Sequence, residues 1–296
     1  MGSATREPPL VRVTLIVLTS LLGISFAALF VRWALPAPPI VTGFYRMLFA
    51  SGVLAAFFLV TRRPVALRGR AALYAAASGL CFGTDLALWH TAIVHTSVAV
   101  ATLLVNTTPV YVGLYVLVVR RQSLDRHFIL GTGLALLGTA TLLGVPTQNL
   151  DDLTGAALAL AAALFYTAYL LLMRAAREAG IDTLSALALM TFSATAVLGA
   201  YGLVAGDAFR GFPTSSWAAM AGAAVLTQIG GVMGIIWALR FLPATLASVA
   251  LLGQPVGTAL LGWWLLGEVL GWAQLLGGAT VLAGIAMASR SATGGD

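Results

Sequence analysis

Long apolar runs separated by short polar stretches dominate the chain. A helix needs about 20 apolar residues to cross roughly 30 Å of hydrocarbon, and ten runs of about this length can be read here. They cover residues 13–34, 40–60, 72–94, 97–119, 128–145, 154–173, 184–205, 217–239, 245–267 and 272–288. Proline or glycine falls between most of the runs, as expected where helices end. The pattern predicts an all-α integral membrane protein with ten transmembrane helices.

Composition agrees with this prediction and removes several classes of function. Of the 296 residues, 60% are hydrophobic and 9% are charged, whereas soluble domains have roughly 45–50% and 25%. The short loops that remain leave no room for a soluble domain. The basic residues are spread over these loops instead of forming one face, which argues against nucleic-acid binding. The single cysteine, Cys81, excludes an intrachain disulfide.

The arginines are distributed unevenly between alternate loops, and this predicts the orientation of the chain. The 16 basic residues are all arginines, and all except Arg32, Arg46 and Arg210 fall in the tails and loops on the side of the two termini. The opposite loops contain Asp151, Asp152, Asp207 and Glu268. We therefore expect a multi-pass protein of the cell (inner) membrane, with both termini cytoplasmic and the loop around Asp151 outside.

The second half of the chain repeats part of the first. Pro109 matches Pro255, Gly131 matches Gly277 and Gly138 matches Gly284, each pair 146 residues apart. Each repeat holds five spans, and because five is odd the second copy enters the membrane inverted. An inverted repeat indicates an alternating-access transporter with a site near the membrane midplane. The expected organisation is a tail (1–12), two five-helix repeats (13–145 and 154–288) and a second tail (289–296).

Two segments resemble the EamA repeat of the drug/metabolite transporter superfamily. They are Trp237–Ile285, which reads WALRFLPATLASVALLGQPVGTALLGWWLLGEVLGWAQLLGGATVLAGI, and Ala87–Leu114, which reads ALWHTAIVHTSVAVATLLVNTTPVYVGL. The likeness covers about residues 13–288 and implies a 5+5 inverted-repeat exporter of small organic molecules. Among the members, the chain most resembles the YddG-type amino-acid exporters. One departure is that Glu268 aligns with Gln122 in the first repeat.

Three ionisable residues lie deep in the predicted spans. A charge at the bilayer centre costs roughly 2.5–3.5 kcal/mol on insertion scales. Arg46 and Asp85 lie about 10 and 14 Å from the outer side, counted at ~1.5 Å per residue. They are interpreted either as a structural ion pair or, for Asp85, as a substrate-amine or proton-coupling site. His90 is interpreted as a hydrogen-bonded cavity residue, with a proton relay as the alternative.

Two spans carry a proline close to an amide side chain, Asn106 before Pro109 and Gln254 before Pro255. Interrupted helices at corresponding positions of two repeats point to a central site, although hydrogen-bonded kinks would give the same pattern. Deep aromatic and amide side chains complete the predicted binding residues, with packing away from a cavity as the alternative for the tyrosines. These residues are Trp89, Tyr111, Tyr166, Tyr169 and Gln228.

Small residues also recur at helical spacing. The segment Gly230–Gly234 contains GxxxG spacing, which predicts close helix packing. Gly131 and Gly138 in the first repeat, with Gly277 and Gly284 in the second, form two stripes. These stripes fit helix packing within the chain or weak self-association between two copies.

A secondary transporter is the function class that best fits these features. An aspartyl intramembrane protease needs two membrane carboxylates, and only Asp85 lies deep. The GxSxG, HExxH and P-loop patterns are absent, and no charged ring or filter loop of a channel can be read. The expected partners are the lipid bilayer and a small zwitterionic or neutral solute such as an amino acid, with no cofactor, metal or nucleic acid. Another metabolite or drug-like solute is the alternative, and an intramembrane enzyme or channel is a more distant one.

Overall fold

The computed structural model describes residues 9–67, 69–144 and 153–290, and these residues form helices and no strand. Ten helical spans are long and apolar enough to cross a membrane, which confirms the predicted fold class. The elements are α1 (Leu10–Trp33), α2 (Pro39–Thr61), α3 (Gly69–His95), α4 (Val98–Val105), α5 (Thr108–Val118), α6 (Arg126–Leu143), α7 (Leu153–Glu178), α8 (Thr183–Ala205), α9 (Thr214–Gly222), the π-helix η1 (Ala223–Val232), α10 (Met233–Ala238), α11 (Ala244–Leu251), α12 (Gln254–Leu266) and α13 (Trp272–Ser289).

Three of the ten spans are not continuous α-helices. The fourth span breaks at Asn106 between α4 and α5, and the ninth breaks at Leu252 and Gly253 between α11 and α12. Pro109 and Pro255 each lie within the first two positions of the following helix, where a missing N–H costs no helical hydrogen bond. The predicted interruptions are therefore present. The eighth span runs through α9, η1 and α10.

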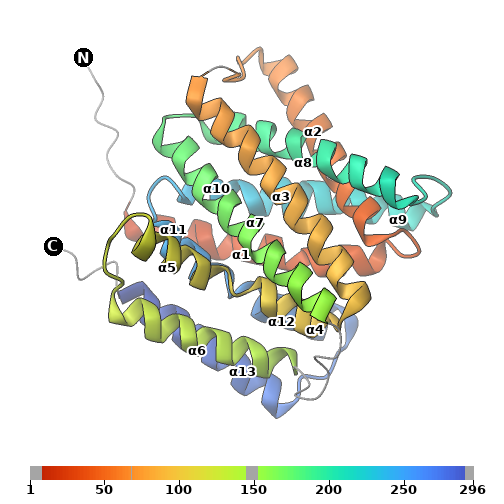
Figure 1. Cartoon of the computed structure of the whole chain (residues 1–296). Coiled ribbons are helices and arrows are strands. Elements are labelled where there is room, and N and C mark those ends of the chain that lie inside the picture. The colour runs from red at the N-terminus through yellow and green to blue at the C-terminus, as the bar shows by residue number, and fades with distance from the viewer. Residues whose placement is uncertain (1–8, 68, 145–152, 291–296) are drawn as a thin grey trace, which may run out of the picture.

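The packing has the two-fold pattern of a 5+5 inverted repeat. The third span of the first repeat, α3, packs against α7 and α8 of the second repeat. Its counterpart in the second repeat, α9–η1–α10, packs against α1 and α2 of the first. The last spans of the two repeats, α6 and α13, pack against each other and lie side by side in Figure 1. The third span of each repeat thus packs against the first and second spans of the other repeat, and the two last spans pack against each other.

Glycines bring the backbones of α6 and α13 into contact. A Cβ on Gly138 would lie 2.7 Å from the carbonyl oxygen of Gly277, and one on Gly284 would lie 2.6 Å from that of Gly131. At these distances only a hydrogen atom fits between the helices. The two glycine stripes are therefore used for packing within the chain. Gly231 of the GxxxG segment likewise lies against α1, as predicted, since a Cβ on Gly23 would be 3.0 Å from its Cα.

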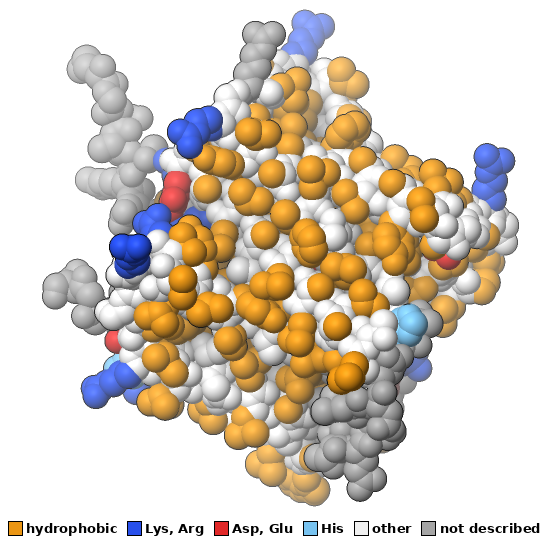
Figure 2. All heavy atoms as spheres, in the orientation of Figure 1, with side chains coloured by type: hydrophobic (Ala, Val, Ile, Leu, Met, Phe, Trp, Pro, Cys, Tyr) orange, Lys and Arg blue, Asp and Glu red, His pale blue; other side chains and the backbone are white. Residues whose placement is uncertain are grey.

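The outer surface matches a bilayer. Figure 2 shows hydrophobic side chains across a whole face of the molecule, with the arginine side chains gathered mainly toward its edges. We call the end of the bundle where α1 begins and α13 ends the proximal face, and the opposite end the distal face. The described arginines at the proximal helix ends include Arg12, Arg70, Arg126 and Arg240. The expected positions of Arg6, Arg68, Asp151 and Asp152 lie outside the described residues.

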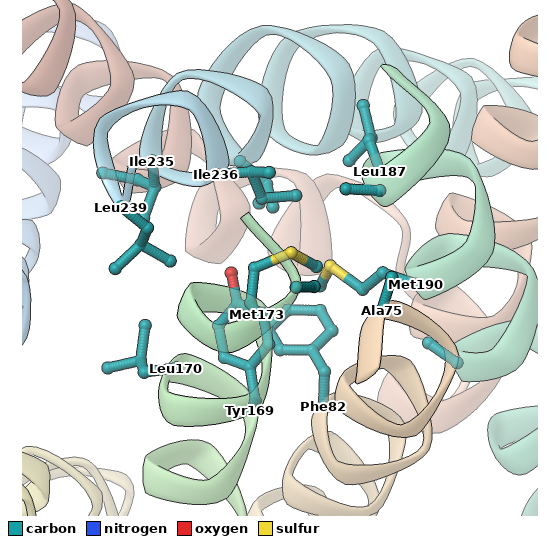
Figure 3. Packing of buried hydrophobic residues seen from close by; sticks show 14 of the residues in the cluster. Ala75, Phe82, Tyr169, Leu170, Met173, Leu187, Met190, Ile235, Ile236 and Leu239 are labelled. Atoms are coloured by element: carbon teal, nitrogen blue, oxygen red, sulfur yellow. The ribbon is translucent and has the colours of Figure 1, made fainter. Parts of the chain in front are cut away.

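The largest buried cluster fills the proximal half of the bundle. It joins side chains of α3, α7, α8, α10 and the residue that follows α10, among them Phe82, Tyr169, Met173, Met190 and Leu239. Figure 3 shows these side chains converging, with the sulfur atoms of the two methionines close to the aromatic rings. Side chains packed in this way fill the space between these helices.

Candidate functional site

A cavity of about 560 Å³ has walls from both repeats, and its lining reaches from the distal end of the bundle to Ile235 and Ser248, nearer the proximal ends of the eighth and ninth spans. On the first three helices its lining residues fall in Ile24–Val31, Thr42–Arg46 and Phe82–Ile93, the parts of these helices farther from the chain termini. Glu268 and Gln274, beyond the distal end of α12, also belong to the lining. The cavity therefore reaches the distal face and ends on the core cluster below it.

The two broken spans contribute matching segments to the cavity wall. Asn106 and Pro109 line it from the first repeat, and Gln254 and Pro255 line it from the second. Ser25 supplies a partner at the second break, because its Oγ donates to the carbonyl oxygen of Gln254 at 3.1 Å. Non-helical backbone at this depth is tolerated where it is buried in protein or lines a cavity, and both conditions hold here.

Arg46 enters the cavity wall from α2 and is 9% exposed. Its Nη2 donates to Oε1 of Gln228 at 2.8 Å, and Nε2 of Gln228 donates to Oγ1 of Thr191 at 3.1 Å. The structural ion pair, one of the two interpretations of Arg46 and Asp85, does not form among the described residues. Equal depth puts two side chains at one level of the membrane but does not turn them toward each other, and Gln228 is the acceptor within reach.

Asp85 and His90 line the same cavity from α3 and are 4% and 5% exposed. In the described part of the chain, Oδ1 of Asp85, Nδ1 of His90 and Nε of Arg46 are buried without a hydrogen-bond partner. A buried polar group without a partner is costly. The described residues contain no group of three side chains that could hold a metal ion. Among the described lining residues, Glu268 is paired with Arg32 at the rim, whereas Arg46 and Asp85 are opposite charges that do not pair with each other.

Aromatic rings form the floor of the cavity. The ring centroids of Phe82 and Tyr169 lie 5.0 Å apart, and those of Tyr166 and Tyr169 lie 5.3 Å apart. Phe82 and Tyr169 also belong to the core cluster of Figure 3, so the floor of the cavity is the top of that cluster. Higher in the wall, the ring of Trp89 lies 5.1 Å from that of His90.

Most of the predicted residues line this one cavity: Arg46, Asp85, Trp89, His90, Asn106, Pro109, Tyr166, Tyr169, Gln254 and Pro255. Tyr111 is not in the lining. It follows the lining residue Pro109 by two positions, which is about 200° around a helix. Gln228 is also not in the lining, since it is completely buried and holds Arg46.

Several polar lining residues were not among the predicted binding residues, and these include Thr42, Thr108, Ser248, Glu268 and Gln274. Thr42 lies one helical turn before Arg46, a spacing that places both on one helix face and could have found it. Ser248 precedes the break between α11 and α12. Nothing in the sequence around Glu268 and Gln274 indicates that the loop joining α12 and α13 folds over a cavity.

An ion pair joins α1 to that loop at the distal end of the cavity. Nη1 of Arg32 lies 2.5 Å from Oε1 of Glu268, and about half of each side chain is exposed. Gly267 adopts a left-handed φ of 67°, which reverses the chain after α12 and lays the Glu268 side chain over Gly262. Exposed ion pairs contribute about 1 kcal/mol or less, so this pair sets the position of the cavity rim more than it adds stability.

Comparison with known proteins agrees with the two repeats seen in the packing. The model of the EamA-like transporter family matches residues 12–144 and again residues 153–290. The chain belongs to the EamA-like transporter family. This family lies in the drug/metabolite transporter superfamily, so the chain is a multi-pass membrane transporter of small solutes, and the family points away from an enzyme.

A solved structure described only as the crystal structure of a protein has the same fold as this EamA-family transporter. The TM-score is 0.80 at 21% sequence identity, and the alignment covers 95% of this chain and 98% of the other. At this identity the likeness concerns the fold alone. Among curated proteins, none matches the chain.

Proposed function

We propose that this EamA-family transporter exports small organic solutes, chiefly neutral and aromatic amino acids, by alternating access around the central cavity. The observation that carries the proposal is the lining of that cavity. Two amides at broken helices, Asn106 and Gln254, lie in the same wall as Arg46 and Asp85. The cavity volume of about 560 Å³ falls in the range of small-molecule sites, roughly 300–1,000 Å³.

The lining supports an amino acid better than a phosphorylated solute. Phosphate is held by clusters of arginine or lysine that bind it through several hydrogen bonds, and among the described residues the lining has no basic side chain other than Arg46 and His90. Amide, hydroxyl and aromatic groups instead fit a small molecule that carries both polar and apolar parts.

Orientation and mechanism belong to the same proposal. Arginine-rich loops mark the cytoplasmic side of membrane proteins, which supports cytoplasmic termini in the cell inner membrane. In that orientation the cavity faces outward and the core cluster closes the cytoplasmic side. Transport then requires the cluster to part while the distal rim closes, as rocking of inverted repeats around a fixed site would do.

Counterflow in proteoliposomes tests the proposal. Vesicles containing the purified transporter are loaded with unlabelled L-phenylalanine or L-leucine and supplied with a trace of the labelled amino acid outside. We expect transient accumulation that saturates with concentration and is missing in protein-free vesicles. A flux that does not saturate would indicate a channel. For direction, cells fed a phenylalanine dipeptide should release phenylalanine faster when the transporter is expressed.

A drug-like apolar solute is the second candidate, and one observation favours it. A smaller apolar pocket of about 220 Å³ lies between α12 and α13 and shares Leu142, Ala259 and Gln274 with the cavity wall. A hydrophobic solute could reach the cavity from the lipid on this side. Accumulation of a lipophilic cation such as ethidium, without accumulation of any amino acid in the same vesicles, would select this candidate.

A further inference from the structure

We infer that Arg46 and Asp85 recognise the two charges of an α-amino acid zwitterion, with Arg46 binding its carboxylate and Asp85 its ammonium group. The inference rests on the proposed function, which names the class of solute but gives it no contacts. On this inference, the solute must carry both a free carboxylate and a free ammonium group, and loss of either group weakens binding separately.

Arg46 is held in place by one hydrogen bond and keeps further N–H donors for a solute. A guanidinium carries five N–H donors in a planar fork, and only the bond from Nη2 to Gln228 is made within the described residues. Gln228 is itself fixed by Thr191 of α8. The guanidinium is thus fixed in the cavity wall with N–H donors that can still form hydrogen bonds. The two oxygens of a carboxylate match the geometry of these donors.

Asp85 has the opposite charge and no protein partner. It is almost completely buried, lines the cavity, and its Oδ1 has no hydrogen bond among the described residues. A carboxylate so placed accepts hydrogen bonds only, so the complementary group is a cation or another donor. A primary ammonium group supplies a charge and three donors.

Arg46 and Asp85 lie in the wall of one cavity without forming an ion pair. Arg46, Asp85, Tyr166 and Tyr169 all line the same cavity. The two charged side chains thus share one cavity wall, yet their N and O atoms are more than 4.0 Å apart, since no ion pair forms between them. An α-amino acid carries its carboxylate and ammonium on one carbon, so it can bind both side chains at once.

The balance of charge selects against other solutes. A simple amine would leave Arg46 without a counter-charge, and a simple carboxylic acid would leave Asp85 without one. In buried surroundings an unpaired charge carries a large free-energy penalty. A zwitterion pairs with both and adds no net charge. With its backbone so held, the amino-acid side chain lies among Phe82, Trp89 and Tyr166, which favours neutral or aromatic residues.

The experiment combines changes in the solute with changes in the protein. Counterflow of labelled L-phenylalanine is competed by unlabelled L-phenylalanine, by N-acetyl-L-phenylalanine, which lacks the ammonium group, and by L-phenylalaninamide, which lacks the carboxylate. We expect the wild type to prefer the complete zwitterion at least about tenfold, since tenfold corresponds to about one charge-assisted hydrogen bond. Asp85→Asn should lose the preference over the N-acetyl compound alone, and Arg46→Gln the preference over the amide alone.

Controls separate recognition from folding. Arg46→Lys keeps the charge and should recover part of the preference over the amide. Arg210→Gln and Glu178→Gln change exposed charges that are not in the cavity lining and should behave as the wild type. The competition series on the wild type needs no variant, so it tests the inference even where a substituted protein does not fold.

The outcomes of the two proposals can be told apart. If the wild type transports L-phenylalanine but binds both analogues equally well, the inference is overturned and the proposed function stands. If folded Asp85→Asn and Arg46→Gln lose affinity for all three compounds by the same factor, the residues act structurally and the inference is again overturned. If no amino acid is transported, the proposed function fails and the inference fails with it.

Discussion

Arg46 shows how a single charged residue is kept inside the membrane-spanning part of the protein. Its guanidinium is bonded to the amide of Gln228, which in turn is bonded to the hydroxyl of Thr191. Both partners are completely buried, so each would lose its hydrogen bond without replacement by water. The depth of Arg46 could be predicted by counting residues along α2. Its partner could not, because this depends on how three helices are rotated about their axes.

At this scale we predict unequal effects for the two partners of this chain of bonds. Gln228→Leu should lower the melting temperature of the purified protein by the equivalent of roughly 1.5–3 kcal/mol, because it removes an acceptor from a charged group. Thr191→Val should cost less, since it leaves only a neutral amide N–H unpaired. Thermal unfolding in detergent measures both. Equal melting temperatures for the two variants and the wild type would contradict the role given to Gln228.

The amides at the helix breaks give a second prediction at the scale of residues. Asn106→Leu and Gln254→Leu should each reduce counterflow at least about tenfold while leaving folded protein in the membrane, because each removes a polar group from the cavity wall. Thr141→Val, at an exposed position on α6, is the matched control and should transport normally. Normal transport by both leucine variants would show that the amides serve packing alone.

At the scale of elements, the breaks in two helices could be predicted from the sequence, whereas the π-helix could not. The breaks before Pro109 and Pro255 could be predicted because proline lacks an N–H and disfavours a continuous helix. The π-helix η1 could not, since the same apolar sequence suits α- and π-helices alike and the choice depends on packing against α1 and α2. Gln228 lies on η1, which is one reason why its contact with Arg46 was not foreseen.

The glycine contact between α6 and α13 gives a prediction with its control in the same helix. In Gly138→Ala the new Cβ would lie 2.7 Å from the carbonyl oxygen of Gly277, so the helices must separate, at a cost of roughly 1–3 kcal/mol. A Cβ at Gly133 meets nothing within 4 Å, and Gly133→Ala should be neutral or stabilising because alanine favours a helix. Only Gly138→Ala should therefore lower the melting temperature. A shared shift would contradict the backbone contact.

At the scale of the whole molecule, the number of spans and the inverted repeat could be predicted because both follow from chain length, apolar runs and matching positions. The shape of the cavity could not. It depends on how the helices pack, and the core cluster beside the cavity takes residues from α3, α7, α8 and α10. Hydrophobic residues of this kind look the same in sequence whether they face lipid, a cavity or the core.

Cysteine accessibility in intact cells tests both orientation and cavity shape. In a Cys81→Ala background, Ala208→Cys in the loop between α8 and α9 should react with an impermeant thiol reagent from outside, whereas Gln122→Cys between α5 and α6 should react only after permeabilisation. Thr102→Cys, in the cavity wall, should also react from outside, because the cavity reaches the distal face. Leu114→Cys faces lipid and should stay unlabelled, since a thiol in hydrocarbon does not ionise to the reactive thiolate.

The pattern of labelling separates the two parts of this prediction. Labelling of Gln122→Cys in intact cells, with Ala208→Cys silent, would reverse the orientation and place the cavity on the cytoplasmic side. Labelling of Ala208→Cys with Thr102→Cys silent would keep the orientation but show that the rim around Arg32 and Glu268 is closed in the cell. In the expected case, saturating L-phenylalanine should slow the reaction of Thr102→Cys and leave that of Ala208→Cys unchanged, because only the cavity thiol lies beside the bound solute.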